Sequence, residues 1–133
     1  TEQIEKVYNL KGAKGAISIA YAPEEKLLFV VSQSTDNLQI LDATDGKLKA
    51  DVKVGAGPLA VVWEPVRKLA YVANRGSDSV AVVDVNGNLV ANLPGGSYAN
   101  HVFTDGKGTV WSVNKARGLN DPQGDHISRY AAK

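Results

Sequence analysis

His101 is the side chain of this sequence best suited to catalysis or ligation. Its imidazole titrates near neutral pH, so it could serve as a general base, a metal ligand or a haem ligand. The other histidine, His126, is distant in the chain, and neither lies in a His-Glu-x-x-His segment. Zinc needs about three protein ligands, and the chain has no cysteine. The sequence therefore predicts no metal and no other cofactor, and the simplest interpretation of His101 is a hydrogen-bonded side chain facing water.

Basic and aromatic residues suggest a second chemistry. Arg75, Lys115 and Arg117 carry positive charge, and Tyr98 could stack a nucleic-acid base, as the aromatic residues of single-strand binders do. The same loops contain four acidic residues: Asp36, Asp78, Asp121 and Asp125. The net charge of the whole chain is only +1. Nucleic-acid binding is therefore a weak expectation.

The segment from Lys115 to Asp125 is about six residues longer than its counterparts elsewhere in the chain. Long loops that join regular elements are frequent binding segments. Asp121 and Asp125 could contribute to a calcium site, but no spaced series of oxygen ligands surrounds them. We therefore expect a binding or solvated loop without a metal.

The composition is that of one globular domain. The chain has 133 residues, of which 44% are hydrophobic and 22% charged. The longest apolar runs, such as 27–31, have five residues and are far shorter than a transmembrane helix, so we expect no membrane insertion. Residue 1 is not methionine, so the chain is expected to begin after processing or to be a piece of a longer protein.

The residues that could do chemistry are positioned by an internal repeat. Phe29 matches Tyr71, and Asp42 matches Asp84, with a spacing of 42 residues in both pairs. A third copy places Trp111 after Tyr71 by 40 residues. We expect these equivalent aromatic residues to pack between repeat units, and Trp63 to lie in the core as well. A repeated unit of this length is typical of propellers and solenoids.

Each unit reads as short strands separated by Asn-Gly and Asp-Gly turns. Three strands of a unit are apolar at consecutive positions, so both of their faces must be covered. The run 48–54 alternates strictly and suits an outer strand. The prediction is an all-β β-propeller of about three four-stranded antiparallel blades, as one segment over 1–133, with blades at about 12–54, 55–96 and 97–133. Residues 4–10 read as an extra outer strand.

The loops before each first strand share one face with the turns between the second and third strands. In the third unit, polar residues stand at the start of the first strand where the second unit has Pro58, Ala60 and Val61. We therefore expect a group of binding residues to converge at the loop face near the mouth of the channel. These residues are Tyr98, Asn100, His101, Arg75, Asn114, Lys115 and Arg117.

The stretches 69–74 and 79–84 resemble the YVTN β-propeller repeat, with a Gly-x-x-Pro start at 55–58. The third copy keeps 104–106 and 110–114 of the pattern, while the first departs at 31–33. The resemblance covers about residues 12–130 and is greatest to the C-terminal part of bacterial YncE-type propellers. It implies a periplasmic or extracellular bacterial protein. Related propellers have lactonase or haem chemistry, which is an analogy of fold only.

Three blades form an open arc with two uncovered apolar faces. The third unit lacks a fourth strand, because 126–130 would be its third. The remaining blades could come from another segment of a larger propeller, which is the first expectation. Alternatively, a second copy of the chain could complete a six-bladed ring, with residues 4–10 closing the partner's last blade.

The functional expectation is a non-catalytic binding or interaction platform that binds an unidentified ligand or protein partner at its loop face. Two alternatives stay open at this point. One is an enzyme of lactonase or haem-dependent type that uses His101. The other is a single-stranded nucleic-acid binder.

Overall fold

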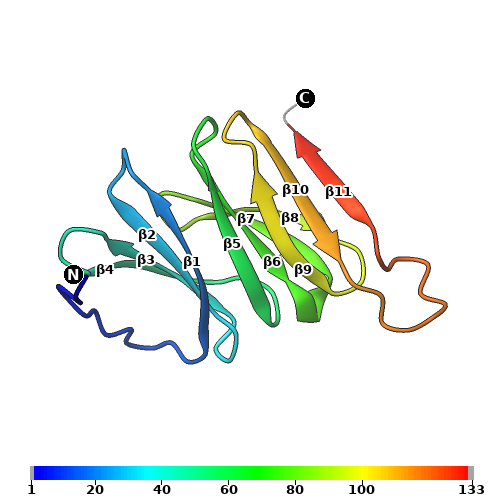
Figure 1. Ribbon diagram of the computed structural model, residues 1–133, viewed down its shortest axis with the longest axis horizontal. Coiled ribbons are helices and arrows are strands. Elements are labelled where there is room, and N and C mark those ends of the chain that lie inside the picture. Colours follow the sequence, from blue (N-terminus) through cyan, green and yellow to red (C-terminus); the bar gives the residue numbers. More distant parts are fainter. Residues whose placement is uncertain (1, 132–133) are drawn as a thin grey trace.

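The chain folds into three antiparallel sheets that stand side by side (Figure 1). This computed structural model describes residues 2–131. The first sheet, blade 1, contains β1 (Ala16–Ala22), β2 (Leu27–Ser32), β3 (Asn37–Asp42) and β4 (Leu48–Lys53). Blade 2 contains β5 (Pro58–Glu64), β6 (Leu69–Asn74), β7 (Ser79–Asp84) and β8 (Leu89–Pro94). Blade 3 contains β9 (Ala99–Thr104), β10 (Thr109–Asn114) and β11 (Ile127–Ala131).

Consecutive strands pair in order within each blade, and a short 3-10 helix, η1 (Arg75–Ser77), joins β6 to β7. The three sheets fall inside the residue ranges expected for the three repeat units. No helix among residues 2–131 is long and apolar enough to cross a membrane.

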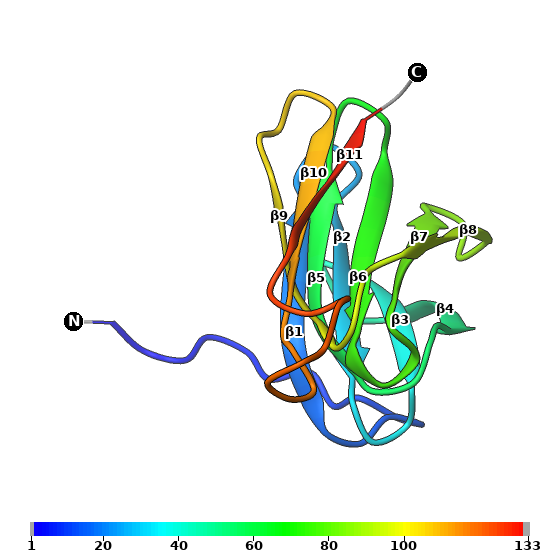
Figure 2. The same ribbon diagram turned by 90° about the vertical axis from the view of Figure 1, so that its right-hand side faces the viewer.

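Burial follows the order of the strands. The middle strands β6 and β7 are buried at nearly every position, whereas the outer strands β4 and β8 are largely exposed. Figure 2 shows the first strands β1, β5 and β9 along one side of the molecule, with β4 and β8 on the other. The all-β architecture expected from consecutive apolar runs is confirmed.

Apolar side chains hold neighbouring blades together. One core cluster lies between blades 1 and 2, where the rings of Phe29 and Trp63 stack with centroids 5.1 Å apart. A second cluster lies between blades 2 and 3 and contains Tyr71 and Val102. The packing role expected for Phe29, Tyr71 and Trp63 is confirmed, because all three are buried. Trp111, also expected to pack between units, is only half-buried, because within residues 2–131 no blade covers its side of blade 3.

We call the packed boundary between two neighbouring blades a seam. In each seam, a backbone N–H of one blade donates a hydrogen bond to an aspartate of the other. Asp36 Oδ1 accepts a hydrogen bond from the Gly57 backbone N–H at 2.8 Å, across the seam between blades 1 and 2. Asp78 Oδ1 accepts the Tyr98 N–H at 2.9 Å across the next seam. Both aspartates have left-handed backbone angles, with φ near 55°. The repeat therefore encodes one backbone-to-carboxylate link per seam, at the loop face.

Residues 4–10, expected to form an extra outer strand, form no strand in the structure. A strand requires a neighbour to take its backbone hydrogen bonds, and within residues 2–131 no backbone hydrogen bond joins this segment to a sheet. Tyr8 instead donates its hydroxyl hydrogen to the Thr44 carbonyl oxygen at 3.1 Å. Within residues 2–131, blade 3 has three strands, β9, β10 and β11.

Candidate binding site

Three segments meet at one end of blades 2 and 3. They are the loop before β9, the helix η1, and the loop between β10 and β11. The Ser97 N–H donates to the Gln123 carbonyl at 3.0 Å, and the Lys115 N–H donates to the Ser97 carbonyl at 3.2 Å. The long loop therefore folds against the loop before β9, at the end of the blade where β9 begins (Figure 1). The sequence expectation that these segments share a face is consistent with this arrangement.

Tyr98 is the centre of the site. The guanidinium carbons of Arg75 and Arg117 lie 4.5 Å and 4.6 Å from the centroid of its ring. Arg75 comes from η1 and Arg117 from the β10–β11 loop, so the ring joins two segments that are far apart in the chain. Each cation–π contact of this kind is worth about 0.5–1 kcal/mol at an exposed position.

Asp78 fixes one of the two arginines. Its two carboxylate oxygens accept hydrogen bonds from Arg117 Nη2 at 2.6 Å and 2.5 Å. The same carboxylate holds the Tyr98 N–H. Desolvation is the largest influence on the pKa of Asp78 and raises it, but the hydrogen bonds from Arg117 and Tyr98 together bring the pKa below its ordinary value. Asp78 is therefore a carboxylate at neutral pH.

Arg75 differs from Arg117 in having no acidic partner among the residues that the structure describes. Within residues 2–131, the ion pairs join Lys49 to Asp42 and Arg117 to Asp78, and neither involves Arg75. The Arg75 side chain is exposed. Its positive charge is therefore available to a ligand, while that of Arg117 is largely compensated.

Tyr98 has a backbone conformation that is unusual for an aromatic residue. Its φ is 50°, in the left-handed region. The corresponding residue of the second unit is Gly57, with φ 59°, and glycine adopts this region without steric cost. A bulky residue there carries strain of about 1–2 kcal/mol. Strain of this kind is common at functional sites, where the surrounding structure holds it in place.

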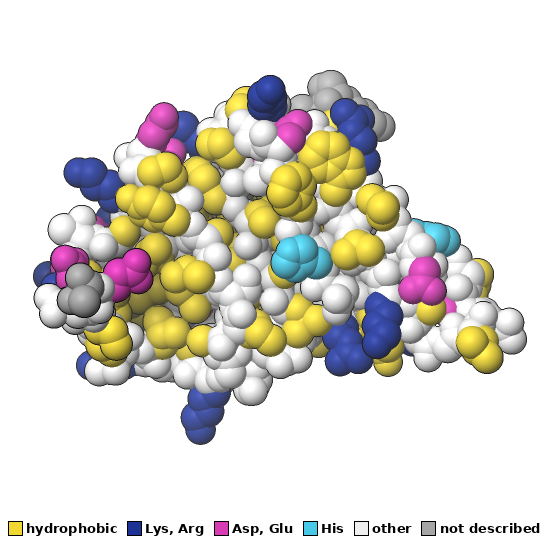
Figure 3. Space-filling view, in the orientation of Figure 1, with side chains coloured by type: hydrophobic (Ala, Val, Ile, Leu, Met, Phe, Trp, Pro, Cys, Tyr) yellow, Lys and Arg dark blue, Asp and Glu magenta, His cyan; other side chains and the backbone are white. Residues whose placement is uncertain are grey.

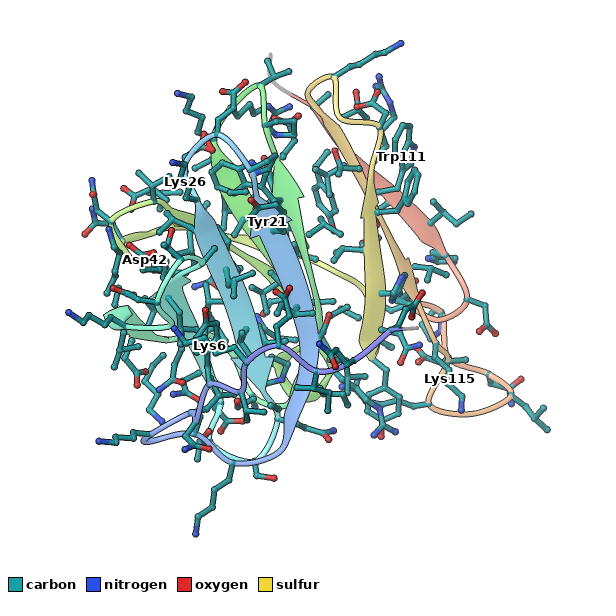
Figure 4. The ribbon with its side chains drawn as sticks, turned by 60° about the vertical axis from the view of Figure 1, so that its left-hand side comes forward. Lys6, Tyr21, Lys26, Asp42, Trp111 and Lys115 are labelled. Carbon is teal, nitrogen blue, oxygen red and sulfur yellow. The ribbon has the colours of Figure 1, made fainter. Side chains whose placement is uncertain are left out.

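Asn114 stabilises the long loop next to the site. It is buried, its Oδ1 accepts the His126 N–H at 2.8 Å, and its side-chain amide donates to the Gln123 carbonyl. Asn114 therefore holds the two ends of the long loop together rather than facing a ligand. Lys115 follows it, exposed at the base of this loop (Figure 4). Asn100 is exposed beside the irregularity where β9 slips relative to β10.

His101 lies apart from the arginine–tyrosine cluster. It pairs with Val113 in the β9–β10 register and lines an apolar hollow together with Phe103, Trp111 and Ile127. The equivalent of His101 in blade 2 is Ala60, which pairs with Ala73, rather than Val61. A shift of one residue along a strand exchanges its faces, so His101 points to the open face of blade 3. Within residues 2–131, no group of three or more His, Cys, Asp or Glu side chains is arranged to hold a metal ion.

Sequence reasoning missed the role of Asp78, which it counted only as a negative charge that neutralises the loop face. The available signal was its spacing of 42 residues from Asp36, both directly before a third strand. That spacing marks Asp78 as part of the repeated seam link. The contact with Arg117 could not be foreseen, because it depends on the path of the long loop.

Together, the blades, their shared seams and their order define an all-β chain with the fold of a β-propeller segment. Among solved structures, a chain titled hydrazine synthase from Kuenenia stuttgartiensis is similar, with a TM-score of 0.77 and 23% sequence identity. The match covers 98% of this chain and 36% of that chain, so this chain spans about a third of that longer protein. The likeness shows the fold alone. No protein-family model matches this chain, and no curated protein matches it.

Proposed function

We propose that this protein is a β-propeller binding platform whose loop face takes a ligand or partner with a negatively charged group, a carboxylate or a phosphate. The cluster of Arg75, Tyr98 and Arg117 binds that group. The observation that carries the proposal is Tyr98, an aromatic residue in a left-handed conformation that stacks with two guanidinium groups. One of these groups, that of Arg75, has no acidic partner within the described part of the chain.

The cluster is suited to anion binding because its parts are already in position. Arg117 is fixed by Asp78, Tyr98 is fixed by its own N–H bond to Asp78, and Arg75 rests on the Tyr98 ring. A pre-positioned side chain loses less conformational entropy when a ligand binds. Arg75 provides planar donors that match a carboxylate or phosphate, and Lys115 adds a further exposed positive charge nearby.

A titration followed by NMR of the backbone amides tests this proposal, with inorganic phosphate and glutarate as probes. We expect both probes to shift the amide signals of residues 75–78, 97–98 and 115–117. Arg75→Ala should weaken binding at least about tenfold, the loss of one charge-assisted contact of about 1.5 kcal/mol. Lys107→Ala, which removes a positive charge from the opposite end of blade 3, is the matched control and should bind as the wild type does.

Two results would count against the proposal. One is a titration in which neither probe moves these signals at millimolar concentration. The other is an Arg75→Ala variant that binds as well as Lys107→Ala. An oligothymidylate tested beside the small anions shows whether a nucleic-acid backbone is the source of the phosphate, since such binding falls steeply with salt.

We also propose, on the YVTN-repeat resemblance of 69–74 and 79–84, that the protein belongs with the bacterial YncE-type propellers and works outside the cytoplasm. The absence of cysteine is compatible with an oxidising compartment. Fractionation of the source cells with an antibody to the protein tests the location. Recovery with cytoplasmic markers would refute it.

A further inference from the structure

The two ends of the arc are apolar and open. On blade 1, β1 exposes Ile17, Ile19 and Tyr21, and on blade 3, Phe103 and Ile127 are exposed. Hydrophobic side chains gather over β1 and over β9 and β10 in the space-filling view (Figure 3). Large apolar faces of this kind are normally covered by another surface.

Several of these positions are buried where a blade has a neighbour. Ile19, which is 61% exposed, corresponds to Val61, which is 4% exposed because blade 1 covers it. Ile127, which is 74% exposed, corresponds to Val80, which is fully buried under blade 3. The open faces of blade 1 and blade 3 are therefore equivalent to the two faces that meet in each of the two seams within this chain.

Aromatic residues at the ends are complementary. At the first seam, Phe29 of β2 stacks on Trp63 of β5. Trp111 stands at the Phe29 position of blade 3, and Tyr21 stands at the Trp63 position of blade 1 (Figure 4). If blade 1 of a second copy followed blade 3 with the same geometry, Trp111 would stack on Tyr21 of that copy.

Polar groups at the ends also match. Asp125 has a φ of 55° and precedes β11 as Asp36 and Asp78 precede β3 and β7. At the other end Gly15, with φ 73°, stands where Gly57 and Tyr98 stand, and no acceptor within residues 2–131 takes its N–H. Asp125 can therefore accept the Gly15 N–H of a second copy, as Asp36 accepts the Gly57 N–H.

His101 fits the same pattern. Its counterpart in blade 1 is Ser18, whose Oγ accepts the Val61 N–H across the first seam at 3.2 Å. The residue of blade 1 that corresponds to Val61 is Ile19. In a new seam, a ring nitrogen of His101 would be placed to accept the Ile19 N–H of a second copy. This gives His101 a structural role on a face where no catalytic partner surrounds it.

The strands also complement each other. Within residues 2–131, blade 3 has no fourth strand, and residues 4–10 belong to none of the three sheets. Lys6–Lys11 precede Leu48–Lys53, the fourth strand of blade 1, by 42 residues, the repeat length. Ile4 and Val7 are exposed. In a propeller, such a segment belongs to the blade that precedes β1.

We infer that two copies of this chain associate head to tail into a closed six-bladed ring. Blade 3 of each copy covers blade 1 of the other, and residues 4–10 of each copy form the fourth strand of the other's blade 3. Six blades lie within the range of four to eight in which propellers close. This inference is independent of the ligand proposed for the loop face.

The mass in solution tests it, by light scattering or native mass spectrometry of the full chain at about 10–100 μM, the range of weak to moderate affinity. We expect twice the 14.1 kDa of one chain. Ile19→Lys and Phe103→Lys should each raise the dissociation constant at least about 100-fold, because they place an unpaired charge in the seam. Both side chains are exposed in the single chain, so its folding should be little affected.

Val66→Lys is the matched control, because Val66 is as exposed as Phe103 but lies in the β5–β6 turn, away from both open faces. It should remain dimeric. A monomeric wild type would overturn the proposal and favour further blades of a longer protein as the cover. An open-ended series of larger species, or a dimer that neither lysine variant weakens, would also overturn it.

A cysteine pair tests the direction of association, since the chain has no cysteine of its own. A chain with Tyr21→Cys and Trp111→Cys should yield a dimer cross-linked by a short bismaleimide. A chain with Val66→Cys and Trp111→Cys should not. Equal cross-linking of the two chains would contradict the head-to-tail seam.

Discussion

At the scale of single residues, the site depends on Asp78. The carboxylate joins three parts of the molecule, because it lies before β7 and binds both the Tyr98 N–H and the Arg117 side chain. The equivalent residue in the first repeat, Asp36, shows which of these contacts is structural. It accepts the Gly57 N–H across the seam but, within residues 2–131, forms no ion pair with an arginine. The arginine contact is therefore an addition to the repeat, made in the one seam that carries the long loop.

The pKa of Asp78 predicts how the site responds to acid. The pKa is lowered from 3.8 in the folded chain, so the ionised carboxylate stabilises the fold above the unfolded value, and this contribution is lost as the pH falls below 3.8 through the folded value. Because the ion pair is partly exposed, it is worth less than about 1 kcal/mol. We expect the Tyr98 and Arg117 amide signals to move toward those of Asp78→Asn in this acidic range.

Asp45→Asn is the control for that experiment, because Asp45 lies in a turn of blade 1 and its carboxylate accepts the Lys47 N–H instead. At neutral pH, Asp45→Asn should leave the amide signals of Tyr98 and Arg117 unchanged, whereas Asp78→Asn should shift them. Signals of Asp78→Asn that coincide with those of the wild type at neutral pH would show that the carboxylate does not hold the loop.

At the scale of elements, the seams are held by buried polar groups as well as by apolar packing. Glu64 ends β5 and is fully buried, where it accepts the Arg67 N–H at 2.7 Å and the Gly108 N–H of blade 3 at 2.9 Å. Arg67 in turn donates to the Tyr71 hydroxyl at 2.9 Å and to the Gly108 carbonyl. One buried carboxylate thus joins blade 2 to the β9–β10 hairpin.

Glu64→Ala should lower the free energy of unfolding by about 3 kcal/mol, because it leaves buried N–H groups without acceptors. Urea unfolding measures the change. Glu24→Ala, at an exposed position in the β1–β2 turn, should change it by less than about 0.5 kcal/mol. Equal stabilities of the two variants would mean that the link from Glu64 to Gly108 contributes nothing.

The sequence predicted which residues form strands better than it predicted the side of the sheet to which each side chain points. Phe29 and Tyr71 were predicted as packing residues from their spacing, because equivalent positions in a repeat face equivalent neighbours. For His101 the spacing was one residue off, because the β9–β10 hairpin is one residue shorter than the β5–β6 hairpin: His101 pairs with Val113, whereas its counterpart Ala60 pairs with Ala73. Side chains alternate along a strand, so that single residue moved His101 from the expected loop face to the open face of blade 3.

At the scale of the whole molecule, the open arc predicts stability that depends on concentration. If two chains close a ring, unfolding includes dissociation, and the melting temperature rises with protein concentration. We expect a rise of about 3 °C for each tenfold increase, from 1.4 kcal/mol per tenfold and the melting entropy of a protein of this size. Calorimetry over a hundredfold range measures it.

Phe103→Lys supplies the comparison for that measurement, because it removes one apolar contact of the proposed seam while leaving the buried core unchanged. Its melting temperature should be lower and should not vary with concentration. A wild-type melting temperature that is the same at all concentrations would argue that the single arc is the stable unit.

The amino-acid sequence by itself determined the repeat, the strands and the all-β class, because these follow from local patterns: consecutive apolar residues, turn glycines and a period of about 42 residues. It also placed Arg75, Tyr98 and Arg117 in loops of one face. Only the tertiary structure decided that the two arginines stack on the Tyr98 ring, that Asn114 is buried, and that His101 lies apart from them. Such contacts depend on the path of the long loop and on strand register, which no local pattern specifies.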